Sequence, residues 1–410
     1  MAAGQTAAAA TKCDEPKRPV LAAPAGKGII PGLDNYFSTG LIMKKIIWLP
    51  VAVVVLVAAW LGASWYTGQR IQAAINERIP LLNQIWAASG TPEQRLQIKQ
   101  ISYQRGLLSS HARYALSLNM LPDEQAPLID LTLWHGPFAG GLAPKKFALH
   151  AELVNAGIVK TISDAAMGGK TPLVVDAACA YGGHCTGASA MPAINYAPIP
   201  QFKLAFGGVQ MQFDINWRSE TDHQGSSRTQ FLPLTINDQN FGSGAIVANS
   251  TAQSVNETLS WKTEKGESKL TLAMTATRPV SIEEFNTVAK PVDILNFMGG
   301  IIKTGSVKLS LSRPMLVDMG ARALNLTSRL DLAAAQQQVS QQLDEALTRD
   351  PRTQEFVQAQ GDAIVSDWQY ADGKLTINGQ EKPEVLAEIT QALKTAMQQA
   401  QRDQAASGQN

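Results

Sequence analysis

"VQMQFDINW", residues 209–217, carries a hydrophobic side chain at every second position and a polar side chain between each pair. This period of two is typical of a β-strand with one buried and one solvated face. Parallel strands buried on both faces would instead show continuous apolar runs. The sequence from about Gln97 to about Thr277 therefore predicts one large antiparallel sheet, curved or doubled over to bury its apolar face. The same alternation recurs in "HARYALSLN" (111–119), "PLIDLTLW" (127–134), "KFALHAEL" (146–153) and "SKLTLAMTAT" (268–277).

The C-terminal third mixes helical periodicity with further strands. Apolar stripes predict helices over residues 281–298, 332–348 and 383–397. The predicted fold class is α+β: a single N-terminal transmembrane helix is followed by a large, mainly antiparallel β-sheet body, which amphipathic helices cover. Strands are expected at "SVKLSLSR" (306–313) and "RALNLTSRLDL" (322–332), and "IVSDWQYADGKLTING" (364–379) is typical of a hairpin that turns at Asp372-Gly373.

Upstream of the predicted sheet, residues 46–67 contain no charged side chain. About 22 helical residues rise roughly 33 Å, which is enough to cross a hydrocarbon core of about 30 Å. Lys44 and Lys45 precede this run, and basic residues tend to stay in the cytoplasm, so the C-terminal part is expected to cross the membrane. The alternative is a signal peptide that is cleaved near Gly62-Ala63-Ser64.

Composition and periodicity divide the chain into segments. Residues 1–42 are rich in Ala, Gly and Pro without an apolar period, so this extension is expected to be disordered. Met1 and Met43 are alternative start sites, and we expect Met43. The remaining segments are a transmembrane anchor (43–68), a juxtamembrane amphipathic helix (69–90), a β-rich domain (97–380), a C-terminal helix (383–400) and a disordered tail (401–410).

Charge and motifs exclude several classes of function. The formal net charge is +1 and only 17% of residues are charged, with Lys and Arg scattered along the chain, so a nucleic-acid partner is not expected. The sequence has no GxSxG elbow, no phosphate-binding glycine loop, no dinucleotide fingerprint and no HExxH or CxxC-type cluster. It therefore predicts no catalytic residues, no cofactor and no metal.

Two cysteines lie close together in "CAYGGHC", residues 179–185. A tight turn at Tyr181-Gly182-Gly183 would place Cys179 and Cys185 opposite each other on the two strands of a hairpin. The spacing is not that of CxxC thiol oxidoreductases. In an oxidising compartment, the sequence therefore favours a structural disulfide.

Four stretches, in their order and spacing, resemble the YdgA-like family of Gram-negative envelope proteins, a domain family without an assigned biochemical activity. The resemblance covers nearly the whole chain from Met43 onward and supports Met43 as the start. It implies an inner-membrane anchor with a cytoplasmic N-terminus and a periplasmic domain, and it brings no catalytic residues. The stretches are "SWYTGQRIQ" (64–72), "ISYQRGLLSSHARYALSL" (101–118), "WHGPF" (134–138) and "YADGKLTINGQ" (370–380).

Two of these motifs contain candidate site residues. Tyr103 and Arg105 are predicted on the same side of a strand, either as a ligand site or as the end of the strand before a turn, where Gly106 would adopt a positive φ. In "WHGPF", we expect His135 to cap a turn formed with Gly136 and Pro137, since no partner for catalysis or metal binding is evident.

Three functions compete. The first is a non-enzymatic binding or envelope-assembly module, held in the membrane by residues 46–67, with an apolar groove for lipid or an envelope protein. The second is a structural scaffold that self-associates as a homo-oligomer, and the third is an envelope hydrolase whose residues come from distant positions. The first two differ in one feature: if the predicted helices cover the apolar face of the sheet, no groove is left.

Overall fold

The computed structural model describes residues 39–88, 96–118, 122, 125–141, 144–219, 221–279, 300–328, 330–349 and 351–407. Residues 1–38 of the expected N-terminal extension and the helix expected over 281–298 lie outside this description. The chain divides into two compact units, Met1–Val55 and Leu56–Asn410, and the second unit contains the sheet.

Helix α1 (Thr39–Ala88) includes the predicted anchor and the predicted juxtamembrane helix, and it continues through Pro80. Its side chains are described for residues 57–80, 82 and 83. Among the side chains that the structure describes, no helix offers a stretch that is both long enough and apolar enough to cross a membrane.

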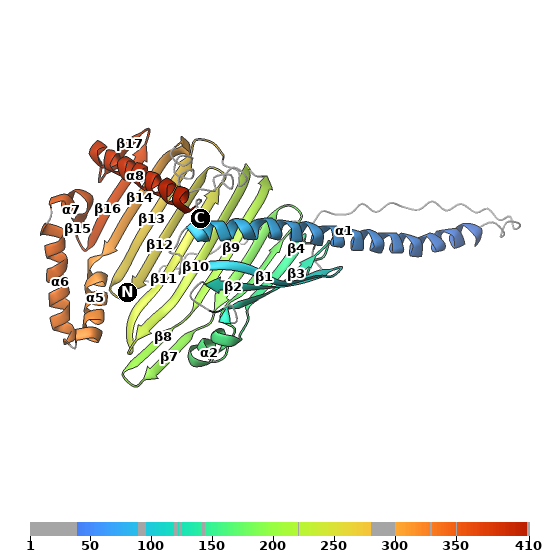
Figure 1. The fold of residues 1–410 in the computed structure, drawn as a ribbon, viewed down its shortest axis with the longest axis horizontal. Helices are drawn as coiled ribbons and strands as arrows, with labels where there is room; N and C mark the ends of the chain where they lie inside the picture. Colours follow the sequence, from blue (N-terminus) through green and yellow to red (C-terminus); the bar gives the residue numbers. More distant parts are fainter. Residues whose placement is uncertain are drawn as a thin grey trace, which may run out of the picture. The chain divides into compact units, whose positions relative to one another are not determined.

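Eighteen strands of the described residues form one sheet, in which all the strand pairs are antiparallel (Figure 1), as the sequence predicts. The first six strands pair in chain order: β1 (Leu96–Arg105), β2 (Ser109–Leu118), β3 (Leu128–His135), β4 (Phe147–Leu153), β5 (Val174–Cys179) and β6 (His184–Met191). The sheet continues from β6 to β9 (Val209–Ser219), β10 (Asp222–Ile236), β11 (Gln239–Thr251), β12 (Ser254–Thr263), β13 (Gly266–Ala276) and β14 (Ile302–Ser312).

The last part of the sheet begins where β14 pairs with β16 (Ala363–Ala371). Strand β16 leads on to β17 (Lys374–Ile377) and β18 (Gln380–Glu381), while β15 (Gln358–Gln360) pairs with its first residues. A side hairpin, β7 (Ile194–Ile199) with β8 (Phe202–Phe206), joins the end of β10. Helix α2 (Gly157–Ala166) connects β4 to β5.

Strand register gives the sheet two chemically different faces, because directly paired residues point to the same side and successive residues alternate. We call the first the apolar face. One row of paired residues on it runs through Ser110, Leu133, Leu149, Ala177, Gly187, Phe213, Ser227, Ala248, Glu257, Leu272, Val307, Trp368 and Ile377. The polar face carries the adjacent row, which includes His111, Thr132, His150, Asp176, Gln212, Arg228, Thr258, Thr271, Lys308 and Asp367.

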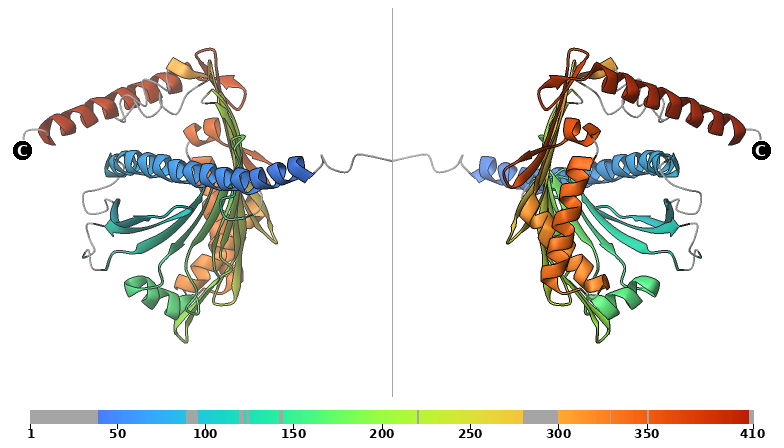
Figure 2. Two further views of the ribbon diagram at one scale, coloured as in Figure 1. Left: turned by 90° about the vertical axis from the view of Figure 1, so that its right-hand side faces the viewer. Right: turned by 90° about the vertical axis from the view of Figure 1, so that its left-hand side faces the viewer.

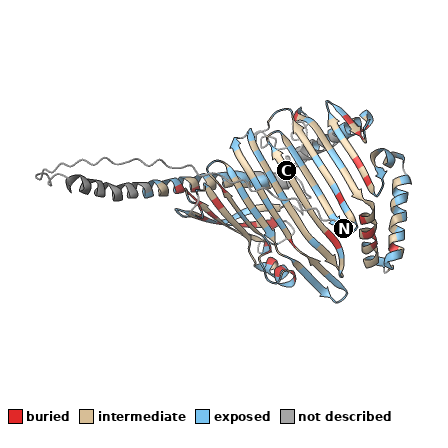
Figure 3. Cartoon of the chain, turned by 180° about the vertical axis from the view of Figure 1, so that it is seen from behind, coloured by how far each residue is buried: buried red, intermediate tan, exposed pale blue. Residues whose placement is uncertain are grey.

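Helices α1 and α8 (Pro383–Ser407) lie on the apolar side of the sheet (Figure 2). Helix α8 packs on β16 and β17 through a small core in which Leu375, Ile377 and Val385 are buried and Trp368 and Leu386 are half-buried. It extends to Ser407, beyond the end expected near residue 400. Seen from behind, the polar face of the later strands is a mixture of half-buried and exposed residues, with no described helix across it (Figure 3).

The helix predicted over 332–348 forms as α6 (Leu332–Arg349), but its main contacts run to α5 (Arg313–Ser328) and α7 (Pro351–Phe356). Val339 packs against Gly320, and Arg313 donates to both carboxylate oxygens of Asp344 at 2.6 Å. Helix α5 contacts β13 and β14, and the Ser268 hydroxyl lies 3.8 Å from the Met315 sulfur. The expectation that α6 covers the apolar face is therefore wrong.

The strand predicted at 322–332 is also wrong, because this stretch ends α5 and begins α6. Met315, Asp318 and Ala321 are the buried residues of α5, and their spacing of three is helical. Arg322 donates to Asp318 at 2.8 Å, four residues earlier, in a largely buried ion pair that only a helix brings together. Local alternation of Leu with polar residues is thus overridden by a helical face.

Cys179 and Cys185 face each other across β5 and β6 and form a disulfide, with an S–S distance of 2.07 Å. The turn between them needs glycine at Gly183, where φ is +83° and a Cβ atom would approach the Trp217 carbonyl oxygen to 1.8 Å. This contact places the turn against strand β9.

Replacing both cysteines by serine should lower the free energy of unfolding by about 2 kcal/mol, because a short covalent loop no longer restricts the unfolded chain. Urea unfolding of the oxidised protein and of the Cys179→Ser/Cys185→Ser variant measures the difference. Equal midpoints and slopes for the two proteins would contradict a stabilising role.

Candidate functional site

His135, at the end of β3, joins helix α1 to the sheet. Its ring is buried, with 2% of the residue exposed. Nδ1 lies 2.9 Å from the Ser64 carbonyl oxygen and Nε2 lies 3.1 Å from the Ser110 hydroxyl. Because a carbonyl oxygen can only accept, we assign the proton to Nδ1, and Nε2 then accepts from Ser110. Both ring nitrogens of a neutral imidazole are thereby satisfied.

The close approach of α1 to β3 depends on small residues. A Cβ atom at Gly68 would lie 2.8 Å from the His135 ring, and one at Gly136 would lie 1.9 Å from the Ser64 hydroxyl oxygen. Gly136 also has a φ of +107°, which disfavours any residue with a side chain. Ser64 and Gly68 are four residues apart and therefore share one helix face, which forms the contact.

A second attachment fixes the other end of α1. The Asn83 side chain donates to the Ile98 carbonyl oxygen at 3.0 Å and accepts from the Ile98 amide at 2.8 Å. It therefore occupies hydrogen-bonding groups of β1, which among the described strands pairs only with β2. Asn83 follows Ser64 by 19 residues, so the two attachments are separated by about 29 Å along the helix.

The predicted pair Tyr103 and Arg105 lies on the same side of β1, under α1. The Arg105 guanidinium lies 5.4 Å from the centre of the Trp65 ring, and the buried Tyr103 hydroxyl has no hydrogen-bond partner among the described residues. Gly106 is not at positive φ, so that expectation is wrong. Glycine fits there because a Cβ atom would approach the Ser109 carbonyl oxygen to 2.8 Å, and the Gly106 amide donates to the same oxygen.

A substrate could not reach the hydroxyl group of Ser110, which lies next to His135. Ser110 forms a serine–histidine pair with it, but Ser110 is completely buried, and the group that orients the imidazole is a backbone carbonyl. Burial lowers the pKa of His135 below its usual value of 6.5; hydrogen bonds to the backbone of Ser64 and Ser109 oppose this shift, and the charge of Arg105 adds to it. The arrangement suits a neutral connector between helix and sheet.

An apolar trough extends along the apolar face, away from α1. We define it by Phe213, Ile215, Val255, Leu259, Leu272, Met274, Val307 and Trp368. Val255, Leu259, Leu272 and Val307 are each 40–42% exposed, which is high for four large hydrophobic side chains on neighbouring strands. The described residues therefore leave this part of the sheet open.

Two cavities lie in the trough. One, of 600 Å³, is open to solvent and lies between the sheet and α8, where Leu272, Val307 and Trp368 face Leu386 and Ile389. The other, of 320 Å³, is lined by Met211, Phe213, Ile215 and Ala248. They are neighbours, because Ser250 lines the second and is paired with Val255, which lines the first. Glu257 is the one charged residue that lines either cavity.

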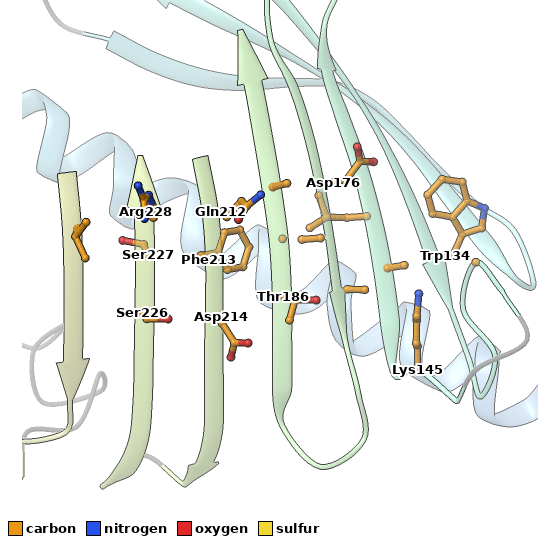
Figure 4. Close-up of a pocket in the computed structure, with 18 residues that line it drawn as sticks. Trp134, Lys145, Asp176, Thr186, Gln212, Phe213, Asp214, Ser226, Ser227 and Arg228 are labelled. Atoms are coloured by element: carbon orange, nitrogen blue, oxygen red, sulfur yellow. The ribbon is translucent and has the colours of Figure 1, made fainter. Parts of the chain in front are cut away.

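The opposite face contains a polar hollow of 780 Å³ (Figure 4). Asp176 is hydrogen-bonded to His150 at 2.8 Å, and Asp214 to His184 at 2.9 Å. Lys145 and Arg228 have no ion-pair partner among the described residues. The hollow is lined by Trp134, Lys145, Ala148, Asp176, Ala178, Thr186, Ala188, Gln212, Asp214, Ser226 and Arg228, together with backbone and side chains between them.

No three His, Cys, Asp or Glu side chains among the described residues come together as a metal site. Three histidines on the polar face have side-chain partners: His111 has the Thr132 hydroxyl, and His150 and His184 have the Asp176 and Asp214 carboxylates. His223 stacks on the Trp217 ring.

The family model described as "Bacterial protein of unknown function (DUF945)" matches residues 43–257 and 245–384, which is most of the chain. The chain belongs to this family. The resemblance of its four motifs to YdgA-like proteins is thereby confirmed.

Individual relatives of the chain are distant in sequence. The chain is 26% identical to Protein YdgA of Escherichia coli (strain K12) over 181 residues, 40% of this chain and 36% of that protein. It is 23% identical to Uncharacterized protein YihF of the same strain over 201 residues, 46% of this chain and 40% of that protein. An uncharacterized protein of Haemophilus influenzae is 28% identical over 96 residues, 23% of this chain and 26% of that protein. The chain thus spans well under half the length of each of these relatives.

Three of the four YdgA-like motifs meet where α1 contacts β3, around Ser64 and Gly68. Ser64 and Gly68 come from the first motif, Arg105 and Ser110 from the second, and His135 from the third. The fourth motif, residues 370–380, forms β17 and its turns, on which α8 packs at the far end of the trough. The motifs therefore fix the two helices that border the trough.

Sequence reasoning missed the residues that shape the hollow. Ala148, Ala178 and Ala188 are inconspicuous in the sequence, yet their small size lowers the floor between larger neighbours. In the sequence, these alanines stand at polar-face positions of three successive strands, where larger polar residues would be expected. Glu257 was detectable in the same way, as a carboxylate at an apolar position in "SVNETLSW" (254–261).

Gly68→Leu should destabilise the attachment of α1 by about 1–3 kcal/mol, because the added side chain meets the His135 ring. Gly62→Leu is the matched control, since a Cβ atom at Gly62 has nothing within 4 Å. Chemical unfolding of the full chain in detergent gives the two free energies. A Gly68 variant as stable as the Gly62 variant would contradict close packing of α1 on His135.

His135 should make the protein less stable as the pH falls below about 6.5. The unfolded state binds a proton at the usual pKa, whereas the folded state resists it until lower pH, so the unfolded state gains by up to about 1.4 kcal/mol per pH unit in that window. Unfolding measured at about pH 7.5 and pH 5.5 should show a smaller difference for His135→Gln than for wild type. His111→Gln, at an exposed position, is the control, and identical pH dependence in all three proteins would refute the assignment.

Proposed function

We propose that this protein is a non-enzymatic, inner-membrane-anchored binding module of the periplasm, which holds lipid acyl chains in the apolar trough. The observation that carries the proposal is the exposure of Val255, Leu259, Leu272 and Val307 beside a 600 Å³ apolar cavity. A cavity of this size is within the range of small-molecule sites, which are mostly apolar with a few polar groups.

The anchor supports a lipid as the occupant. The uncharged residues 46–67 have the length of a bilayer span and lie in α1, the helix that His135 and Asn83 attach to the sheet. A membrane-held protein keeps its trough within reach of lipid. Ser64 is buried against β3, so we place the outer end of the span before Ser64 rather than at Thr67.

The shape of the trough favours an acyl chain over a protein partner. Two neighbouring cavities, one of them between α8 and the sheet, form an extended apolar slot rather than a flat patch. A second copy docking on the face would leave the cavity under α8 empty, whereas an acyl chain can enter it. Each methylene buried there contributes about 0.8 kcal/mol.

Photocrosslinking in cells tests this proposal on the full chain, which retains the contacts of Ser64 and Gly68. A photoreactive benzoylphenylalanine at Leu272, in the trough, should yield an adduct of phospholipid mass. The same residue at Thr271 is a matched control, because Thr271 is the next residue in β13 and points to the polar face.

Lipid adducts at Leu272 and not at Thr271 would support lipid binding. An adduct at Leu272 with a second copy of the chain would favour the self-associating scaffold instead, and an adduct with another protein would favour an assembly role. Equal lipid labelling at Leu272 and Thr271 would mean that the trough is not selective, and the proposal would fail.

A further inference from the structure

We propose that the polar hollow binds a short, linear, uncharged oligosaccharide. The hollow opens on the face opposite the trough, although Phe213, Ser226 and Ser227 line both the hollow and the smaller trough cavity; oligosaccharide binding does not require lipid binding. It rests on the shape of the hollow, the side chains that line it and the balance of their charges.

The hollow is an elongated, open-sided depression. Its lining residues come from seven neighbouring strands, β3, β4, β5, β6, β9, β10 and β11, and from the segment before β4, and six inter-strand spacings of about 4.8 Å span roughly 29 Å. Ala148, Ala178 and Ala188 lower the floor along this line. An open depression of this length fits a segment of a linear polymer better than a compact small molecule, which usually occupies a more enclosed site.

The lining suits a ligand that has apolar ring faces and many hydroxyl groups. Trp134 and Lys145 lie at one end of the hollow and Arg228 at the other (Figure 4). Trp134 offers a flat apolar surface with a polar edge, on which the C–H face of a sugar ring can stack. Between the ends, Asp176 and Asp214 accept hydrogen bonds, while Gln212 can both donate and accept.

The carboxylates are held in place before any ligand arrives. His150 binds Asp176 and His184 binds Asp214, each through one carboxylate oxygen. The second oxygen of each remains available to accept from a hydroxyl, and the cations at the ends can donate. A preorganised set of planar donors and acceptors lowers the entropy lost when a polyhydroxylated ligand binds.

The charge balance of the hollow excludes nucleic acids and acidic glycans as ligands, and the pairing of its central strands excludes a peptide that adds a strand. Two carboxylates face two cations, so the hollow has no excess positive charge to attract a phosphate backbone or an acidic glycan. A peptide that adds a strand needs a free sheet edge, whereas the central strands of the hollow, β5, β6 and β9, are each paired on both sides.

The test is titration calorimetry of the full chain in detergent with neutral linear tetrasaccharides, namely N-acetylglucosamine tetramer, cellotetraose and maltotetraose. Wild type should bind at least one of them with a dissociation constant below about 1 mM. Ala188→Phe, which fills the hollow from an exposed position, should weaken that binding at least about tenfold.

Ala190→Phe is the matched control. Ala190 is exposed on the same strand and the same face, two residues further along, and does not line the hollow. It should bind the sugar as wild type does. The proposal is overturned if wild type binds none of the tetrasaccharides, if the Ala188 variant binds as tightly as wild type, or if both phenylalanine variants lose binding equally. Binding of inorganic polyphosphate in preference to the sugars would also overturn it.

Discussion

Unbroken strand register is the constraint on which both surfaces of this protein depend. From Ser110 to Ile377, residues on successive strands pair directly, so every second position points to the same side. A slip of one residue in any strand would exchange its apolar and polar side chains between the faces. The irregularities in pairing lie away from this row, for example between Gln100 and Ser102 and beyond Phe231. The trough and the hollow are thus two consequences of one register.

Attachment of α1 decides how much of the apolar face stays open. Two contacts about 29 Å apart, at His135 and at Asn83, hold the helix over the first strands of the sheet. The contact at His135 is close because Gly68 and Gly136 have no side chain, and it is specific because both ring nitrogens have a partner. A helix fixed here cannot also cover the later strands. At the other end, α8 is fixed on β17, and the trough lies between them.

The sheet could be predicted from the sequence because its signal is local. Alternation in a stretch such as residues 209–217 specifies a strand with one apolar face, and the preference for antiparallel pairing follows from the polar face. The failures arose where tertiary contacts override local pattern. Residues 322–328 alternate as a strand would, yet helix α5 is fixed by the Asp318–Arg322 pair and by the burial of Ala321. Likewise, α6 has an apolar stripe, but no sequence pattern states that α5 rather than the sheet will cover it.

For the candidate site, too, the sequence indicates individual residues but not the partners that are distant from them along the chain. Motif spacing singled out Arg105 and His135, but it did not show that the carbonyl oxygen of Ser64, seventy-one residues earlier, accepts a hydrogen bond from His135. Distant pairing of this kind leaves no periodic trace in one sequence.

The chemistry of the two sheet surfaces, in contrast, follows from the strand register once the strands are aligned. Leu272 lines the trough, while Thr271, the next residue in β13, points to the polar face. Because only the thickness of the sheet separates the two surfaces, adjacent residues of one strand point to surfaces of different polarity. Phe213, Ser226 and Ser227 line both the hollow and the smaller cavity of the trough, so a ligand on one face would be separated from a ligand on the other by a single strand layer.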